Sequence, residues 1–236
     1  MLIKSSRNYG ISQIKAVVYG PPGVGKTTLA RTLDGKTLVA SAEAGLLSLS
    51  DSDVDFIDAT QDDDGNTLSK ADRLAKMNKI RAWLETPEAR SRYTNIVIDS
   101  LTEIGQNVVE KQSKLFPERK DGLVMWGEVG KEMREFIKSW RDLSGYNVIF
   151  TALSEVDKDD TGARFHNIAL PGKIAQQIAG YFDEVFFYHT YQNDEGLVRV
   201  LVTQPTDKVI AKDRSGKLSA MEAPDLGAVF RKIRGQ

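Results

Sequence analysis

The chain contains no cysteine and only two histidines, His166 and His189, among its 236 residues. Disulfide bonds, thiolate metal centres, iron–sulfur clusters and a thiol nucleophile are therefore excluded, and two imidazoles are too few for a dedicated zinc site. No apolar run approaches the roughly 18 residues of a membrane-spanning helix. The first residues, MLIKSSRNYG, lack the apolar stretch of a signal peptide. We expect a cytoplasmic protein without a membrane partner.

A dominant charge of one sign is also missing, because 32 Lys and Arg residues balance 33 Asp and Glu residues to a formal net charge of -1. No global positive field marks the chain as a nucleic-acid-binding protein. The composition is 41% hydrophobic and 28% charged, which is typical of a globular chain large enough to bury one core. We find no internal repeat and no linker rich in Pro or Ser. The sequence predicts one core over residues 1–220 and a short C-terminal extension over 221–236.

Short apolar runs alternate with helical patterns along most of the chain. Five runs rich in apolar and β-branched residues are expected to be parallel strands, at 14–19, 37–40, 54–57, 95–99 and 147–152. Ser69 and Ser100 each open a capping-box pattern that predicts a helix, and Asp225 precedes a last short helix. Three later runs predict consecutive antiparallel strands, at 184–191, 197–203 and 208–211. The predicted fold class is α/β, with a mostly parallel sheet flanked by helices and antiparallel strands added at its C-terminal edge.

The segment after the first run carries the phosphate-binding pattern G-x-x-x-x-G-K-[ST] in full, from Gly20 to Thr27. Its glycines permit backbone angles in which successive N–H groups point at phosphate oxygens, and the helix expected over 27–33 would add partial positive charge at its N-terminus. Lys26 is expected to reach the β- and γ-phosphates, and the Thr27 hydroxyl to ligate Mg²⁺. The predicted cofactors are ATP and Mg²⁺. The predicted nucleotide-binding residues are Gly20, Pro21, Pro22, Gly23, Val24, Gly25, Lys26, Thr27 and Thr28.

Two acidic residues that follow strands complete the predicted chemistry. Asp99 ends the buried run 95–99, where it is placed to hold Mg²⁺, mostly through water. A second carboxylate has to orient the attacking water. Ser100 follows Asp99 directly, so the Asp-Glu pair of AAA+ proteins is absent, and Glu103 is better explained as the capping partner of Ser100. Glu43, just beyond the run 37–40, is therefore the predicted catalytic acid.

The order of P-loop, strand-end Glu43 and the tripeptide IDS at 98–100 resembles the RecA-like class of P-loop ATPases. With GPPGVGKTTLA at 20–30 and KDRSGKL at 212–218, the chain is similar over residues 12–220 to small phage-encoded RecA-like ATPases associated with recombination and single-strand annealing. The resemblance implies an ATPase that acts on single-stranded DNA, self-associates into a ring or filament, and works beside a single-strand binding protein in a bacterial host. Leu153 and Ser154 stand where RecA has a Gln sensor.

The same resemblance implies two further groups of site residues. The segments 116–126 and 154–173 correspond to DNA-binding loops, although acidic residues offset their cations and flexible solvated loops are the alternative. Lys212 and Arg214 resemble the K-x-R-x-G element of hexameric helicases, whose two cations reach the ATP site of the next subunit, with a charged turn in solvent as the alternative. The candidate DNA contacts are Arg119, Lys120, Trp126, Lys158, Arg164 and Lys173.

Other functions stay open on the sequence alone. An AAA+ loader or remodelling ATPase shares the P-loop sequence but has the Asp-Glu pair that this chain lacks. A small-molecule kinase of this size needs an Arg-rich lid, whereas the segments available here are acidic or mixed. A nucleotide-dependent scaffold with little turnover is the third alternative. The leading prediction is an ATP-hydrolysing, oligomer-forming RecA-like protein that acts on single-stranded DNA in recombination, annealing or replication.

Overall fold

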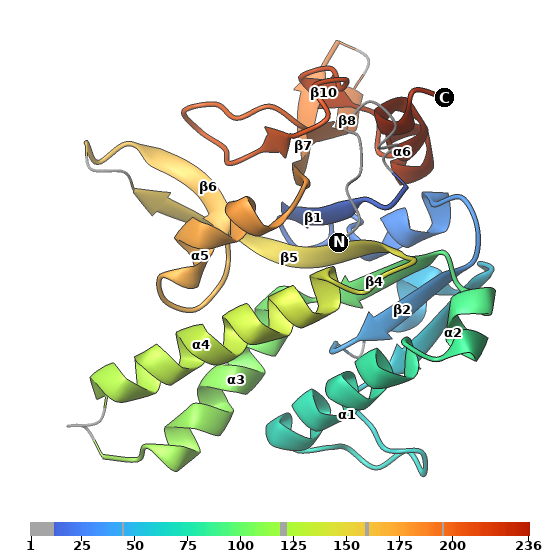
Figure 1. The fold of residues 1–236 in the computed structure, drawn as a ribbon. Helices are drawn as coiled ribbons and strands as arrows, with labels where there is room; N and C mark the ends of the chain where they lie inside the picture. Colours follow the sequence, from blue (N-terminus) through green and yellow to red (C-terminus); the bar gives the residue numbers. More distant parts are fainter. Residues whose placement is uncertain (1–11, 44, 119–121, 159–160, 195) are drawn as a thin grey trace, which may run out of the picture.

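A computed structural model describes residues 12–43, 45–118, 122–158, 161–194 and 196–236 (Figure 1). Its centre is a ten-stranded sheet. Eight strands follow one another in the order β10-β8-β7-β1-β5-β4-β2-β3. The other two lie off this order, β6 paired with β5 and β9 paired with β7. The strands are β1 (Lys15–Gly20), β2 (Thr37–Ser41), β3 (Val54–Asp58), β4 (Asn95–Asp99), β5 (Asn147–Lys158), β6 (Arg164–Ile168), β7 (Glu184–Asn193), β8 (Gly196–Val202), β9 (Lys212–Asp213) and β10 (Met221–Glu222).

The middle of the sheet is parallel, because β7, β1, β5, β4, β2 and β3 pair side by side in the same direction. Every residue of β2 and β4 is buried, as expected for strands covered on both faces. The five apolar runs predicted as parallel strands all form them, and the α/β fold with a mostly parallel sheet is confirmed. The antiparallel pairs are β7 with β8, β7 with β9, β8 with β10, and β5 with β6.

Helices cover both faces of the sheet. One large apolar cluster joins α1, α3 and α4 to one face, and a second joins the first 3₁₀ helix and α6 to the other. Figure 1 shows α3 and α4 as a long antiparallel pair beside α1. The helices are η2 (Thr27–Thr32), η3 (Leu46–Leu49), α1 (Lys70–Trp83), α2 (Pro87–Arg92), α3 (Leu101–Leu115), α4 (Gly122–Arg141), α5 (Ile174–Gln177), η5 (Ile178–Tyr181) and α6 (Leu226–Arg234).

The predicted helix starts are confirmed by their caps. The side chains of Ser69, Ser100 and Asp225 each accept a hydrogen bond from the main-chain N–H three residues later, at the first turns of α1, α3 and α6. Helix α6 also packs closely on η2, since a Cβ on Gly227 would lie 2.4 Å from the carbonyl oxygen of Thr32. The C-terminal segment expected as an extension is thus packed against the P-loop side of the sheet. No described helix is long and apolar enough to cross a membrane.

Two strand predictions differ from the structure. The run 184–191 lies in β7, which pairs parallel with β1 and so continues the parallel sheet before β8 turns back on it. The run 208–211 is not a strand; Val209 makes only an isolated bridge to His166, and β9 follows at Lys212. The reason is the position of β7 between β1 and β8. Strand β8 pairs with β7 only from Phe187 onward, and β9 pairs with the first two residues of β7, Glu184 and Val185.

The segment 154–173 is not a simple loop. Strand β5 continues as far as Lys158 and pairs with β6 in an antiparallel hairpin that projects from the sheet (Figure 1). The hairpin escapes prediction because the residues of β5 beyond Leu153 are mostly polar, so that no apolar run marks the outer half of this strand. The same strand therefore belongs to the buried sheet in its first half and to an exposed hairpin in its second half.

Candidate functional site

The carboxyl ends of the central parallel strands meet at one edge of the sheet and bring the predicted site residues together. Gly20 ends β1 and pairs with Leu153 of β5, while Asp99 ends β4 and pairs with Ser41 of β2. Glu43 follows β2 by two residues. In open α/β sheets this edge is where ligands bind. The fold thus places the P-loop, Asp99 and Glu43 around one region, although they are far apart in the sequence.

The start of the P-loop lies against the main chain of β7. A Cβ on Gly20 would lie 2.0 Å from the carbonyl oxygen of Tyr188, a distance at which backbone atoms must move apart. Gly23 has φ 75° and Gly25 has φ 103°, the left-handed region that favours glycine. A Cβ on Gly23, in contrast, would meet no atom within 4 Å. The three glycines of the motif therefore serve two purposes, close approach at the first and backbone conformation at the other two.

These two purposes give a testable difference in stability. Gly20→Ala is expected to lower the free energy of unfolding by about 3 kcal/mol, because β1 and β7 must separate to make room for the methyl group. Gly23→Ala is the matched control and is expected to cost about 1 kcal/mol, from the left-handed conformation alone. Chemical denaturation of both variants measures the difference. Equal losses would show that the contact between Gly20 and Tyr188 is not tight.

Lys26 lies at the end of the P-loop and folds back over it. Its Nζ donates hydrogen bonds to the carbonyl oxygens of Gly20 at 2.9 Å and Pro21 at 2.8 Å. Burial lowers the pKa of the Lys26 ammonium below its ordinary value, and the negative charges of Asp99 and Glu43 oppose that shift. An ammonium that is partly removed from water and held only by carbonyl oxygens is well placed to exchange those partners for phosphate oxygens.

The helix that follows the P-loop is shorter and tighter than predicted. The sequence predicts a helix over 27–33, but the structure has a six-residue 3₁₀ helix, η2. Three of its residues are threonines, which have low helix propensity, and Thr32 donates a hydrogen bond to the carbonyl oxygen of Leu29 at 2.8 Å. A helix this short contributes little dipole. Attraction for phosphate at this site rests on Lys26 and the loop rather than on a helix terminus.

A hydroxyl and a carboxylate meet beside the loop. Thr27 Oγ1 donates a hydrogen bond to Asp99 Oδ2 at 2.8 Å, while Asp99 Oδ1 accepts one from Thr151 of β5. Asp99 is 5% exposed, so both of its oxygens are held in a nearly dry environment. A hydroxyl and a carboxylate oxygen at hydrogen-bond distance are a donor set of the kind that Mg²⁺ prefers. Thr27 and Asp99 therefore fit the metal-side role predicted for them.

The Glu43 side chain is held close to Asp99 by Ser100, the residue that follows Asp99 in the chain. The Ser100 hydroxyl donates a hydrogen bond to Glu43 Oε1. Burial raises the pKa of the Glu43 carboxyl, and the charges of Asp99 and Glu103 raise it further, whereas the Ser100 hydrogen bond and Lys26 lower it. A carboxylate with one oxygen anchored and a raised pKa is suited to accept a proton or to orient water through its other oxygen.

Glu103 turns away from this site. Its carboxylate pairs with Lys70 of α1, Nζ to Oε1 at 2.5 Å, and lies 3.6 Å from Arg73. Its main-chain N–H donates to the Ser100 hydroxyl, so the cap of α3 is present. Its carboxylate, however, ties α3 to α1 instead of returning to Ser100. Of the two glutamates weighed on the sequence, Glu43 is the one directed at Asp99 and the P-loop region.

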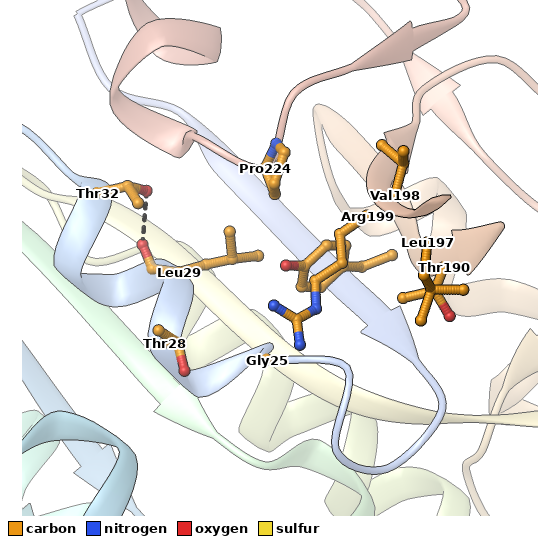
Figure 2. A pocket seen from close by; sticks show the side chains of 10 residues that line it. Gly25, Thr28, Leu29, Thr32, Thr190, Leu197, Val198, Arg199 and Pro224 are labelled. Atoms are coloured by element: carbon orange, nitrogen blue, oxygen red, sulfur yellow. Dashed lines mark hydrogen bonds between the residues drawn. The ribbon is translucent and has the colours of Figure 1, made fainter. Parts of the chain in front are cut away.

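A cavity of about 560 Å³ opens on the other side of the P-loop (Figure 2). The loop and η2 form one wall, with Gly25, Thr28, Leu29 and Thr32, and the β7–β8 hairpin forms the other. Sequence reasoning did not find the hairpin side of this cavity, which comes from residues more than 150 positions after the P-loop. Its hairpin and C-terminal lining residues are Tyr188, Thr190, Leu197, Val198, Arg199 and Pro224.

Lys212 and Arg214 lie at the opposite end of β7 from the P-loop. Asp213 pairs with Glu184, and Glu184 pairs with Ala16. Ala16 precedes Gly20 by four residues, which corresponds to about 13 Å along β1. Lys212 Nζ donates to the carbonyl oxygens of Phe182 at 2.6 Å and Ala179 at 3.2 Å.

Arg214 is exposed and pairs with Asp183 at 2.7 Å. Its guanidinium lies on the surface of its own subunit, at the end of β7 that is remote from the P-loop. The structure therefore brings neither Lys212 nor Arg214 to the ATP site of the same chain. A role in ATP chemistry for either residue requires the site of a neighbouring subunit.

The candidate DNA contacts fall into two groups and an undescribed pair. Lys158 and Arg164 are directly opposite each other in the β5–β6 hairpin, and both are exposed. Trp126 of α4 is 47% exposed and approaches Gly172, next to the exposed Lys173. Arg119 and Lys120 lie outside the described residues.

Both histidines stack on Phe187. The ring centroids are 4.8 Å apart for His166 and 5.0 Å apart for His189, as expected of ordinary side chains rather than metal ligands.

The sheet, the P-loop and the two strand-end acids define a P-loop ATPase of RecA-like α/β fold. A family model described as an AAA domain matches residues 12–215, and the chain belongs to this family. A search of curated proteins finds no match. The match supports nucleotide binding and ATPase activity, and it leaves the DNA substrate and the recombination role as proposals.

A solved structure has a similar fold at low sequence identity. It comes from work described as the structural and biochemical analysis of a prototypical ATPase from the type III secretion system of pathogenic bacteria. The identity is 14% and the TM-score 0.50, over 75% of this chain and 51% of that chain. The protein thus spans about half the length of that ATPase, and at this identity the similarity is one of fold.

Proposed function

We propose that the protein binds and hydrolyses ATP with Mg²⁺ and acts on single-stranded DNA in recombination, annealing or replication. The observation that carries the ATPase chemistry is the convergence of three groups at one sheet edge. These are the Lys26 ammonium on the P-loop, the Thr27–Asp99 hydrogen bond, and the Glu43 carboxylate held by Ser100. Each group matches one requirement of phosphoryl transfer: a cation for the phosphates, oxygen ligands for a metal, and a carboxylate for water.

In this mechanism Lys26 exchanges the carbonyl oxygens of Gly20 and Pro21 for oxygens of the β- and γ-phosphates. Thr27 and Asp99 would hold Mg²⁺, and Thr151 fixes the second oxygen of Asp99 so that the carboxylate keeps its orientation. When bound, Mg²⁺ supplies positive charge that neutralises the phosphate oxygens. Glu43 keeps one oxygen on Ser100 and uses the other to orient the attacking water.

The nucleotide would lie across the P-loop with its two ends on opposite sides. Lys26, Asp99 and Glu43 mark the γ-phosphate end, since all the charged groups of the proposed chemistry are there. Gly25 and Thr28 belong to the wall of the 560 Å³ cavity, which falls within the range of about 300–1,000 Å³ typical of small-molecule sites. The base and ribose would occupy this cavity, between η2 and the β7–β8 hairpin.

The β5–β6 hairpin supports the proposed link to DNA. Strand β5 carries Thr151, which binds Asp99, and seven residues later Lys158 at the exposed end of the hairpin. One continuous strand therefore connects the metal side of the ATP site to two exposed cations, Lys158 and Arg164. Leu153, where RecA has a Gln sensor, donates its main-chain N–H to Thr102 of α3 at 2.9 Å. We infer that a shift of β5, rather than a Gln side chain, couples the two sites.

The DNA contact is tested by neutralising three cations together. The triple variant of Lys158, Arg164 and Lys173 to Ala is expected to weaken binding of a single-stranded oligonucleotide. The log–log slope against salt should also flatten by about 2, which corresponds to three lost phosphate contacts. Fluorescence anisotropy between about 50 and 200 mM salt measures both quantities. The control removes three exposed cations on other elements, Lys79, Arg90 and Lys232.

Equal slopes for the two triple variants would contradict the DNA contact. If the parent protein does not bind single-stranded DNA at low salt with ATP present, a second candidate function is favoured. This candidate is an ATPase or nucleotide-dependent scaffold that does not act on DNA, either an AAA+-type loader or remodelling ATPase or a scaffold with little turnover. The AAA domain match is the observation that favours this candidate. The ATPase rate with and without single-stranded DNA separates the two, because only the DNA-acting enzyme should be stimulated.

A further inference from the structure

The wall of the cavity opposite the P-loop carries one arginine. Arg199 of β8 is directly opposite Thr190 of β7, which places both side chains on the same face of the hairpin. Figure 2 shows the Arg199 guanidinium directed across the cavity toward Gly25 and Thr28. Arg199 is exposed, and none of the ion pairs between described residues includes it. Within the described residues, the cation directed into the cavity therefore has no partner of opposite charge.

The other polar side chains of the cavity end in hydroxyls. Among the described lining residues there is neither a carboxylate nor a side-chain amide. The Thr32 hydroxyl is already used, since it donates to the Leu29 carbonyl and accepts from the Leu226 N–H at 2.9 Å. Thr28, Thr190 and Tyr188 remain, and a hydroxyl can rotate to donate or to accept. These side chains therefore offer no fixed donor or acceptor that would separate the 6-amino group of adenine from the 6-oxo group of guanine.

The position of Arg199 points to the base end of the nucleotide rather than to the phosphates. Lys26 and Thr27 do not line this cavity, and they are engaged with the loop carbonyls and with Asp99 instead. The apolar lining from Leu29, Leu197 and Val198 suits the flat faces of a base. A planar guanidinium stacks on such a face, an interaction that favours the larger purine rings over pyrimidines.

We propose that Arg199 stacks on the nucleobase and that the site accepts purine nucleoside triphosphates, with ATP and GTP bound about equally well. The proposal rests on the proposed function, because it takes the P-loop to hold the phosphates and the cavity to hold the base. It makes Arg199 a residue that sets affinity and base class without a part in the hydrolytic chemistry.

The test is equilibrium binding of ATP, GTP, CTP and tripolyphosphate, each with Mg²⁺. ATP and GTP are expected to bind within about tenfold of each other, and CTP more weakly. Arg199→Ala should weaken ATP and GTP roughly 5- to 30-fold and leave tripolyphosphate binding unchanged. Arg199→Lys should recover only part of the loss, because an ammonium keeps the charge but not the stacking plane. Arg90→Ala, which removes an exposed arginine of α2, is the control and should change none of the four affinities.

Three results would overturn the proposal: a preference of more than 100-fold for ATP over GTP, an equal loss of tripolyphosphate affinity in Arg199→Ala, or no change in ATP affinity. The second would make Arg199 a phosphate ligand. Failure of the proposed function looks different. In that case the parent protein would bind none of the four compounds, or Lys26→Ala would bind them as well as the parent.

Discussion

Replacing Glu43 by Gln is expected to slow ATP hydrolysis by a factor on the order of 100 or more while ATP affinity stays near that of the parent. The amide keeps the shape of the side chain and can still bind the Ser100 hydroxyl, but it cannot accept a proton from water. Steady-state phosphate release measures the loss of turnover, and equilibrium binding of ATP measures the affinity. The unequal effect on these two quantities distinguishes a residue that acts on water from one that binds nucleotide.

Glu103→Gln is the matched control, because Glu103 is the other glutamate in contact with Ser100, to which it donates its main-chain N–H from the first turn of α3. Its carboxylate pairs with Lys70 and Arg73, away from Asp99. Loss of these ion pairs is expected to cost at most about 1 kcal/mol of stability and to leave hydrolysis unchanged. If Glu103 proved essential and Glu43 dispensable, the RecA-like arrangement of the water-orienting acid would be wrong for this protein.

Arg214→Ala is expected to abolish hydrolysis without weakening ATP binding. In the transition state negative charge spreads over the γ-phosphoryl oxygens, and Lys26 with Mg²⁺ covers only part of it. Arg214 lies at the far end of β7 from its own P-loop, so it can act only on a neighbouring subunit. Mixing Arg214→Ala with Lys26→Ala should restore part of the activity, because some interfaces then join an intact P-loop to an intact arginine.

Lys217→Ala is the control for this experiment. It removes a cation from the same loop, but the Lys217 ammonium is bound to the carbonyl oxygen of Ile233 in α6. The parent's specific activity should rise steeply with protein concentration if the site is completed between subunits. Two results would contradict a role of Arg214 in a neighbouring site: a specific activity that does not depend on protein concentration, measured on a monomer, or no recovery of activity on mixing. The Arg214–Asp183 pair would then be an ordinary surface ion pair.

The centre of the fold and the phosphate end of the site could be predicted because their signals are local. The P-loop is a contiguous motif, and Asp99 and Glu43 follow buried apolar runs whose ends meet in any parallel sheet. Ser69, Ser100 and Asp225 predict their helices because a cap is set by neighbours within one turn. In each case the physical cause lies within a few residues of its effect.

The rest depends on pairings between distant segments. Arg199 enters the cavity only because β8 is in register with β7, and β7 lines it only because it lies beside β1. The alternation of side chains along a strand indicates part of the cavity wall, because it places Tyr188 and Thr190 on one face of β7 and Phe187 and His189 on the other. The β5–β6 hairpin was missed for a different reason. Apart from Val156, the residues in the outer part of β5 are polar, and polar strands carry no hydrophobic pattern.

The most direct test of the ATPase chemistry is phosphate release from Mg-ATP by the parent protein and by Lys26→Ala. The ammonium lies over the P-loop with only loop carbonyls as partners, so its removal should leave the fold intact. Circular dichroism checks that condition. We predict turnover by the parent, none above background for Lys26→Ala, and ATP binding that is greatly weakened in the variant. Equal turnover by the two folded proteins would contradict the assignment of the P-loop as the site of hydrolysis.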